Sequence, residues 1–276
     1  MKVDSHHHFW IYSPEEYGWI REDMDRLRRD YLPADLQTEI RSAGIDAVVS
    51  VQARQSEAET DWLLELAQQH DFIRGIVGWA PLRDEDVAQK LERWSHAQHF
   101  KGVRHVVQDE PDREFPLGDA FNRGVSILKN YGLVYDILIY HYHLPVAIEF
   151  VDRHPEQPFV LDHIAKPEIR RGRFDTAWAG NMRELARREN VTCKFSGVAT
   201  EVRDAEYDID LIRPYWETAL EAFGPRRLMF GSDWPVCLLR IEYADWVNMV
   251  RQLAQGLSDD EQQWLWGKTA QQAYRL

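Results

Sequence analysis

The chain has 276 residues, of which 44% are hydrophobic, and its formal net charge is −13. This length and composition suffice for a single domain with a large core. The acidic balance argues against nucleic acid or an anionic membrane as a partner, because both require a basic surface. The two cysteines, Cys193 and Cys237, are too few for a disulfide scaffold and are expected to be reduced and buried.

The sequence predicts neither a membrane span nor a signal peptide. No apolar run approaches the roughly 20 residues that a bilayer span requires. The first residues, Met1–His6, contain no apolar signal region. We therefore expect a cytoplasmic protein. No linker, repeat or low-complexity segment divides the chain, so residues 1–276 are expected to form one domain.

Short runs rich in β-branched and apolar residues alternate along the chain with longer stretches at helical spacing. These candidate strands begin near residues 2, 46, 73, 100, 133, 159, 191 and 227. Eight βα units of about 32 residues predict a single (β/α)8 TIM-type barrel. Additional C-terminal helices are expected near residues 241–255 and 258–274. An open doubly wound sheet is the alternative, but no G-x-G-x-x-G motif follows a candidate strand.

Several predicted helices have recognisable starting signals. Ser56 and Glu59 have the spacing of a capping box, in which each side chain hydrogen-bonds the backbone amide of the other. A helix over residues 33–43 begins with a proline, which suits a first turn, and Pro145 and Pro214 likewise fit first-turn positions. These signals place helices between the predicted strands, as a barrel requires.

The first predicted strand ends in three consecutive histidines, His6, His7 and His8. The functional groups of such a barrel lie at the C-terminal ends of its strands. Because side chains alternate along a strand, His6 and His8 are expected to point to one side and His7 to the other. Two imidazoles on one side can share a metal ion or polarise an oxygen. A chance cluster or a tag remnant is the alternative.

Three later strands also end in polar residues. The fourth ends in Arg104 and His105, the sixth is followed by His163 and Lys166, and the eighth is followed by Asp233. Taken singly, such a histidine is commonly a structural core residue, and such an aspartate commonly caps a turn. Taken together with the histidines of the first strand, they form one convergent group at the predicted mouth of the barrel.

On these residues the sequence resembles the amidohydrolase superfamily. Within it, the chain is similar to the branch that hydrolyses lactones, which includes L-fuconolactonases, L-rhamnonolactonases and a pyrone-dicarboxylate lactonase. The similar segments extend over nearly the whole chain, and they are Asp4–Trp10, Gly102–Pro111, Leu161–Pro167, Lys194–Gly197 and Arg227–Leu239. The resemblance implies a lactone hydrolase that opens a sugar-derived lactone, such as L-fucono- or L-rhamnono-lactone, to the aldonic acid.

The resemblance also bears on metal content. Many two-metal members of the superfamily carry a bridging lysine or glutamate on the fourth strand and a histidine ligand on the fifth. Here the fourth strand offers Arg104 and His105, and the sequence does not establish whether His141, beyond the fifth strand, faces inward. The resemblance therefore implies either no required metal, our leading expectation, or a single zinc ion. The ligands of that zinc would be His6, His8, His163 and Asp233.

Lactone hydrolysis needs an activated water and a polarised carbonyl group. Asp233 is our candidate general base, since a carboxylate can take a proton from water and later return it to the leaving alkoxide. His6, His8 and His163 would polarise the carbonyl oxygen, either as hydrogen-bond donors or by holding a zinc ion.

Substrate recognition is expected from residues near the strand ends. Arg104 could bind a substrate oxygen through its planar guanidinium, or form a salt bridge within the protein instead. Aromatic rings suit the apolar face of a sugar. The full set of expected substrate-binding residues is Arg104, His105, Lys166, Trp10, Trp79 and Trp234. Four further histidines are expected at the surface, and they are His70, His96, His99 and His154.

Three other functions remain open from the sequence. A zinc-dependent decarboxylase of aromatic acids belongs to the same superfamily, and a chelator would abolish its activity. A multiply anionic, aromatic-derived lactone would need several arginines at the mouth, where only Arg104 and Arg54 are candidates. A non-catalytic barrel that binds sugar or metal is disfavoured, because every position of the convergent group holds a residue competent for catalysis.

Overall fold

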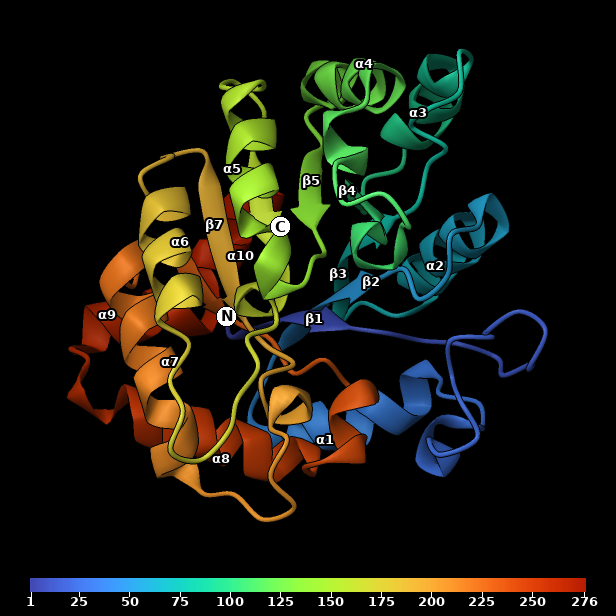
Figure 1. The fold of residues 1–276 in the computed structure, drawn as a ribbon. Coiled ribbons are helices and arrows are strands. Elements are labelled where there is room, and N and C mark those ends of the chain that lie inside the picture. Colours follow the sequence, from blue (N-terminus) through green and yellow to red (C-terminus); the bar gives the residue numbers. More distant parts are fainter.

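The computed structural model describes residues 1–276 and contains one sheet of eight parallel strands in the order β1 to β8 (Figure 1). The strands are β1 Val3–His7, β2 Ala47–Val51, β3 Ile73–Gly78, β4 Phe100–His105, β5 Val134–Ile137, β6 Phe159–Leu161, β7 Val191–Phe195 and β8 Leu228–Phe230. Each strand begins within one residue of its predicted start. The (β/α)8 barrel predicted from the sequence is confirmed.

The barrel closes between its last and first strands through the residues that follow β8. The backbone amide of His8 donates to the carbonyl of Trp234 at 2.7 Å, and the amide of Asp233 donates to the carbonyl of His6 at 2.7 Å. Closure therefore places the end of the histidine-bearing strand directly beside Asp233, although more than 220 residues separate them in the chain.

Helices α1 to α8 each follow the strand of the same number and lie around the outside of the barrel (Figure 1). The helices are α1 Pro33–Ala43, α2 Glu57–Gln69, α3 Val87–Ser95, α4 Asp119–Leu128, α5 Leu144–Asp152, α6 Thr176–Ala186, α7 Ile209–Phe223, α8 Tyr243–Leu253, α9 Asp259–Gln263 and α10 Thr269–Tyr274. A π-helical turn over Trp264–Lys268 separates α9 from α10, so the predicted C-terminal helix near residues 258–274 is interrupted.

Two of the predicted helix signals act differently from the expectation. The Ser56 hydroxyl accepts from the amide of Glu59, but Glu59 does not return the bond. Its carboxylate instead accepts from the amides of Ala53 and Arg54 after β2. The buried Glu59 carboxylate therefore binds these two backbone amides and does not bind the amide of Ser56.

The proline signals were correct for Pro33, which begins α1, and for Pro145, and wrong for Pro214. Pro145 lies in the first turn of α5. Pro214 lies inside α7, because that helix begins earlier, at Ile209, where the Asp208 side chain accepts from the amide of Leu211. The N-terminal cap therefore decides where this helix starts.

The interior of the barrel is apolar at its amino-terminal end. Its side chains are those of Val3, Ala47, Val49, Val51, Val77, Val134, Val160 and Met229, joined by Ala270 and Tyr274 of α10. Lys101, near the start of β4, donates to the carbonyl of Arg275 at 3.0 Å. The C-terminal segment thus closes this end of the barrel, and the polar site lies toward the other.

Most of the remaining placements agree with the sequence analysis. Cys193 and Cys237 are free and buried, as expected. Four histidines were expected at the surface, and this prediction is wrong for His154. It is buried, and its ring contacts the side-chain oxygen of Asn122 at 2.7 Å. No helix combines the length and apolar character that crossing a bilayer requires.

Candidate active site

The end of β1 carries two histidines that face each other inside the barrel. The pairing register between β1 and β2 shifts between Asp4 and His7. The Nε2 atoms of His6 and His8 lie 3.2 Å apart, whereas His7 contacts the hydroxyl of Ser50 on β2 at 2.8 Å. The histidines therefore alternate as the sequence analysis expected.

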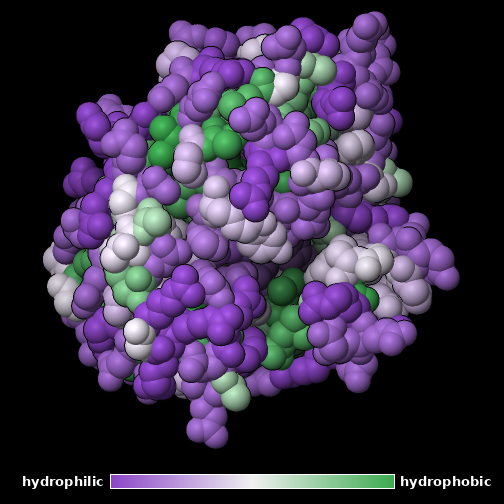
Figure 2. Space-filling model, in the orientation of Figure 1, coloured by the Kyte–Doolittle hydropathy of each residue, from purple (hydrophilic) through white to green (hydrophobic).

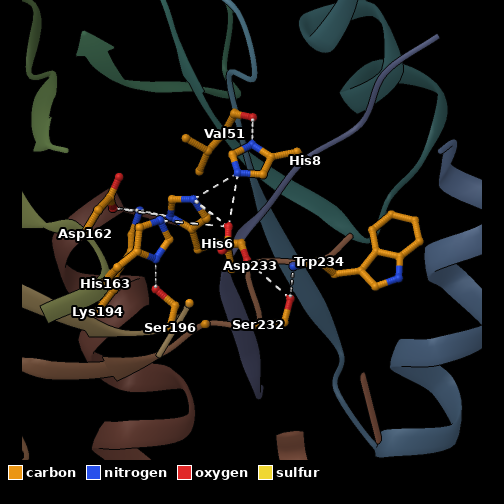
Figure 3. A network of polar contacts seen from close by, with 12 residues as sticks. His6, His8, Val51, Asp162, His163, Lys194, Ser196, Ser232, Asp233 and Trp234 are labelled. Atoms are coloured by element: carbon orange, nitrogen blue, oxygen red, sulfur yellow. Dashed lines mark hydrogen bonds and ion pairs between the residues drawn. The ribbon is translucent and has the colours of Figure 1, made fainter. Parts of the chain in front are cut away.

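Asp233 completes a compact group with these histidines and with His163 (Figure 3). Its Oδ1 lies 3.3 Å from His8 Nε2, 3.7 Å from His6 Nε2 and 3.9 Å from His163 Nε2. None of these four side chains is more than 7% exposed. The structure thus brings together the four residues for which the sequence predicted catalysis or metal binding.

The backbone that carries His163 and Asp233 is strained. The consecutive residues His163–Lys166 have φ angles between 47° and 59°, and Asp233 has a φ of 61°. Each non-glycine residue in this left-handed region costs roughly 1–2 kcal/mol, and such strain persists mainly where function requires it. The indole nitrogen of Trp178 donates to the carbonyl of Ile164 at 2.7 Å and helps to hold the turn.

A buried network of charged residues lies beneath this group, and the sequence analysis gave no role to three of its members, Asp136, Asp162 and Lys194. Lys194 Nζ donates to Asp136 Oδ2 at 2.6 Å and lies 2.9 Å from Asp162 Oδ1. Arg104 Nη1 donates to Asp162 Oδ2 at 3.0 Å. Two cations and two carboxylates therefore compensate one another, which buried charges require.

The sequence contained a signal for this network. Asp136, Asp162 and Lys194 lie within or directly after otherwise apolar strand segments. A charged residue that is buried on a strand needs a partner of opposite charge. The identity of each partner depended on the closed barrel, because these residues come from β5, β6 and β7 and meet β1 only in its interior.

Arg104 is held in place by the protein. Its Nη2 donates to the backbone carbonyl of Gln52 at 2.5 Å and to the Gln52 side-chain oxygen at 3.1 Å. The salt bridge weighed as the alternative in the sequence analysis is therefore present, with Asp162 as the partner. Arg104 also lines the cavity described next, and its Nε has no hydrogen-bond partner.

A cavity of about 370 Å³ opens beside the group. Small-molecule sites commonly enclose about 300–1,000 Å³. Its wall includes His8, Arg104, His163, Lys166 and Asp233, and its apolar part consists of Trp19, Ala53, Val106, Leu138 and Val236. His6 has no exposed surface and lies behind this wall. The face of the molecule in Figure 2 is mostly hydrophilic and is hollowed near its centre.

Comparison with known proteins shows which family this chain belongs to. The model of the family described as amidohydrolase matches residues 3–276. The chain belongs to the amidohydrolase family. The family resemblance given by the sequence is confirmed.

This amidohydrolase has relatives of named activity. It is 41% identical to the L-fucono-1,5-lactonase of Burkholderia multivorans over 289 aligned residues, which cover 100% of this chain and 96% of that protein. It is 32% identical to the L-fucono-1,5-lactonase of Burkholderia ambifaria, with 89% and 84% of the two chains covered. A crystal structure of a Burkholderia multivorans amidohydrolase with bound zinc superposes with a TM-score of 0.96 at 41% identity, covering 100% of this chain and 99% of that one.

The donor atoms of this amidohydrolase fit one zinc ion. With zinc–ligand bonds of about 2.0–2.1 Å, the ligand atoms of a tetrahedral site lie roughly 3.3 Å apart. The distances among His6 Nε2, His8 Nε2 and Asp233 Oδ1 are 3.2, 3.3 and 3.7 Å. His8 Nδ1 donates to the carbonyl of Val51 at 2.8 Å, which is the kind of contact that orients metal-binding histidines.

The end of β5 adds no ligand to this group. His141 is partly exposed, its Nδ1 lies 3.0 Å from Asp175 Oδ2, and it does not line the cavity. A second set of potential ligands, His6, Asp162 and His163, shares His6 with the first. The two sets therefore overlap at His6.

The prediction that Trp10 and Trp234 bind substrate is not supported by their positions. Trp10 is fully buried, with its indole nitrogen donating to the carbonyl of Arg29 at 2.9 Å. Trp234 points away from the catalytic group (Figure 3) and packs against Tyr31. Both rings pack against Tyr31 of the long connection from β1 to α1, which is coloured blue in Figure 1. That connection instead supplies Trp19 to the cavity.

Two further residues expected to bind substrate lie outside the cavity wall. Trp79 Nε1 donates to His105 Nδ1 at 3.4 Å, and His105 Nε2 contacts Glu110 at 2.6 Å. The His105 ring also stacks on Phe115. Because side chains alternate along β4, an inward Arg104 requires an outward His105. Of the expected set, Arg104 and Lys166 line the cavity.

Burial and the neighbouring groups together set the protonation of His6, His163 and Asp233. Burial lowers the pKa of His6 well below its usual range and lowers the pKa of His163 to about 4. For Asp233, burial by itself raises the pKa, but the neighbouring His163 and the hydrogen bond with His8 outweigh it, and the pKa falls below its ordinary value. At neutral pH the group therefore consists of a carboxylate beside neutral His6 and His163 rings.

Proposed function

We propose that this amidohydrolase hydrolyses the ring ester of an aldonolactone, with L-fucono-1,5-lactone as the first candidate, and releases the open-chain acid. The observation that carries this proposal is the carboxyl group of Asp233 beside His8 and His163 in the wall of a cavity of about 370 Å³, a volume that suits one sugar ring. The 41% identity to an L-fucono-1,5-lactonase over the full chain supports it.

Asp233 acts as the general base in this mechanism. Its carboxylate takes a proton from a water molecule in the cavity as the water oxygen bonds to the lactone carbonyl carbon. The bond between that carbon and the ring oxygen then breaks. The leaving alkoxide receives the proton that Asp233 holds, so the carboxylate is regenerated and the ring opens to the acid.

Positive charge and N–H donors near the cavity stabilise the oxyanion that forms. Lys166 and the guanidinium group of Arg104 supply positive charge from the cavity wall. The hydroxyl of Ser196 can donate to His163 Nδ1, which lies 2.9 Å away, and this leaves an N–H at His163 Nε2. His8 donates to the carbonyl of Val51 through Nδ1, and its Nε2 lies 3.3 Å from Asp233 Oδ1.

We propose that the reaction does not require a metal, because the base and the positive charges are side chains of this chain. When a zinc ion is bound, His6, His8 and Asp233 would hold it, and it would supply Lewis-acid polarisation. The crystal structure of a 41%-identical relative contains bound zinc, which supports a zinc ion as the metal that this family member can hold.

A panel of aldonolactones tests the proposed function. The purified protein is mixed with each lactone in a pH-indicator assay, with and without a chelator. We expect rapid acid release from L-fucono-1,5-lactone that survives the chelator. Acid release from none of the lactones would contradict the hydrolase proposal, whereas loss of activity with chelator and its recovery with zinc would contradict only the metal-independent mechanism.

The kcat/KM of lactone hydrolysis should not change with pH in the range where histidines ordinarily titrate. Asp233 is ionised above a pKa that lies below its ordinary value, and His163 is neutral above about pH 4. Acid therefore protonates the base only below this range, and we expect kcat/KM to stay flat from about pH 5 to pH 8. Initial rates in buffers of constant ionic strength measure this. A fall centred near pH 6.5 would show that a catalytic histidine titrates instead.

Trp19 should contribute to substrate binding and not to chemistry. Trp19→Ala removes the largest apolar side chain of the cavity wall, so we expect KM for the lactone to rise by about 10-fold while kcat changes little. Trp79→Ala is the matched control, since Trp79 lies outside the wall. Steady-state kinetics on both variants measure the difference, and an equal rise of KM in the two would contradict the assignment of Trp19.

A further inference from the structure

His6 is held between a donor and an acceptor at the same ring nitrogen. Its Nδ1 lies 3.1 Å from Lys194 Nζ, which donates to it, and 3.3 Å from Asp162 Oδ1. All three side chains are fully buried. Asp162 Oδ1 has no hydrogen-bond partner of good geometry, so it remains able to accept a bond from His6. The surroundings of Nδ1 therefore suit both tautomers of the neutral ring.

The other ring nitrogen of His6 faces Nε2 of His8. Because His8 Nδ1 donates to the carbonyl of Val51 at 2.8 Å, a neutral His8 has only a lone pair at Nε2. His6 Nε2 lies 3.2 Å from it. Two lone pairs at this distance repel each other, so either a proton on one of the two rings or a cation between them must separate them.

We propose that Lys194 and Asp162 are positioning residues that let His6 exchange tautomers when a cation enters the site. Without the cation, His6 donates from Nε2 to His8 and accepts at Nδ1 from Lys194. With the cation, both Nε2 lone pairs face the ion, and Nδ1 donates to Asp162. One proton moves from Nε2 to Nδ1, and the ring stays neutral throughout.

The partners of Lys194 keep it in place during this exchange. Asp136 Oδ2 accepts from Lys194 at 2.6 Å and from the hydroxyl of Tyr274 at 2.7 Å. Tyr274 belongs to α10, which closes the amino-terminal end of the barrel. The C-terminal helix therefore supports His6 through two hydrogen-bonded residues, and Lys194 cannot withdraw when it loses its bond to His6.

One contact favours the opposite arrangement in the cation-free site. Arg104 Nη1 lies 3.3 Å from His6 Nε2 and would donate to a lone pair there. Its bond to Asp162 Oδ2 is shorter, at 3.0 Å, and the His6–His8 contact is also shorter, at 3.2 Å. We therefore expect the proton on His6 Nε2, and the two arrangements are distinguishable by experiment.

Nitrogen chemical shifts of the histidine rings test this proposal directly. Long-range proton–nitrogen spectra of histidine-labelled protein are recorded after chelator treatment and again with zinc, with the His6 signals assigned from His6→Gln. We expect protonated Nε2 without zinc and protonated Nδ1 with zinc. The same tautomer in both states would overturn the proposal. Neither readout depends on which ester the site hydrolyses, so failure of the proposed function would not affect it.

Two variants separate the roles of the residues at Nδ1. Asp162→Asn weakens the acceptor for the zinc-bound tautomer, so we expect zinc affinity, measured by chelator competition, to fall by about 10- to 100-fold. Lys194→Met removes the donor, so we expect protonated Nδ1 even in the cation-free protein. If this variant does not fold, the spectra of the wild-type protein still decide.

Lys166→Met is the matched control for charge. It removes one cation from the cavity wall without touching His6, so it should leave the cation-free tautomer as in the wild type. A cation-free tautomer in Lys194→Met that matches this control would overturn the role of Lys194. An unchanged zinc affinity in Asp162→Asn would overturn the role of Asp162.

Discussion

Asp233→Asn should lower kcat for lactone hydrolysis by on the order of 10²- to 10⁴-fold, the usual contribution of a positioned general base. An amide cannot accept the proton of the attacking water. Asparagine suits this test because it tolerates the left-handed conformation that Asp233 adopts, with φ of 61°. Initial rates measured at matched zinc content provide the comparison. Retention of more than a tenth of the activity would show that the base lies elsewhere.

Asp109→Asn is the control for this variant. Asp109 also lines the cavity, but it is exposed and lies on the turn after β4, away from the buried histidines. The same chemical change at Asp109 should leave kcat within about 2-fold of the wild type, because it removes no base. Equal losses of kcat in the two variants would mean that general charge, and not proton transfer, explains the effect.

Gly197→Ala should reduce kcat by roughly 100-fold while the barrel stays folded, because small displacements of catalytic groups have effects of this size. A Cβ at Gly197 would lie 2.7 Å from His163 Nδ1 and 3.0 Å from Asp233 Oδ2. The φ of +62° at this glycine adds strain for any other residue. Both catalytic side chains must therefore shift. Steady-state kinetics and thermal unfolding of the same preparation measure the two effects.

Gly180→Ala provides the matched comparison. Gly180 lies in α6, and a Cβ there would meet no atom within 4 Å. Alanine in a helix is favoured over glycine by about 0.5–1 kcal/mol, so this variant should be slightly more stable and fully active. Wild-type kcat in Gly197→Ala would show that the space beside His163 and Asp233 is not needed for catalysis.

The sequence by itself determined the barrel and the four residues, His6, His8, His163 and Asp233, that lie together at the ends of its strands. The alternation of short apolar runs with amphipathic stretches located all eight strands, because parallel strands covered by helices must be apolar on both faces. The alternation of side chains along a strand separated His6 and His8 from His7. Asp233 and His163 followed from the rule that functional groups of such barrels lie after the strands.

Only the tertiary structure decided which residues surround that group. No local sequence pattern identifies the partners of Lys194, Asp136 and Asp162. These residues come into contact only when strands that are distant in the chain form the closed barrel. The aromatic wall likewise depended on the path of the connection from β1 to α1, which buries Trp10 and brings Trp19 to the cavity. Periodicity reports which face of an element is buried, whereas contacts between elements follow from closure and loop geometry.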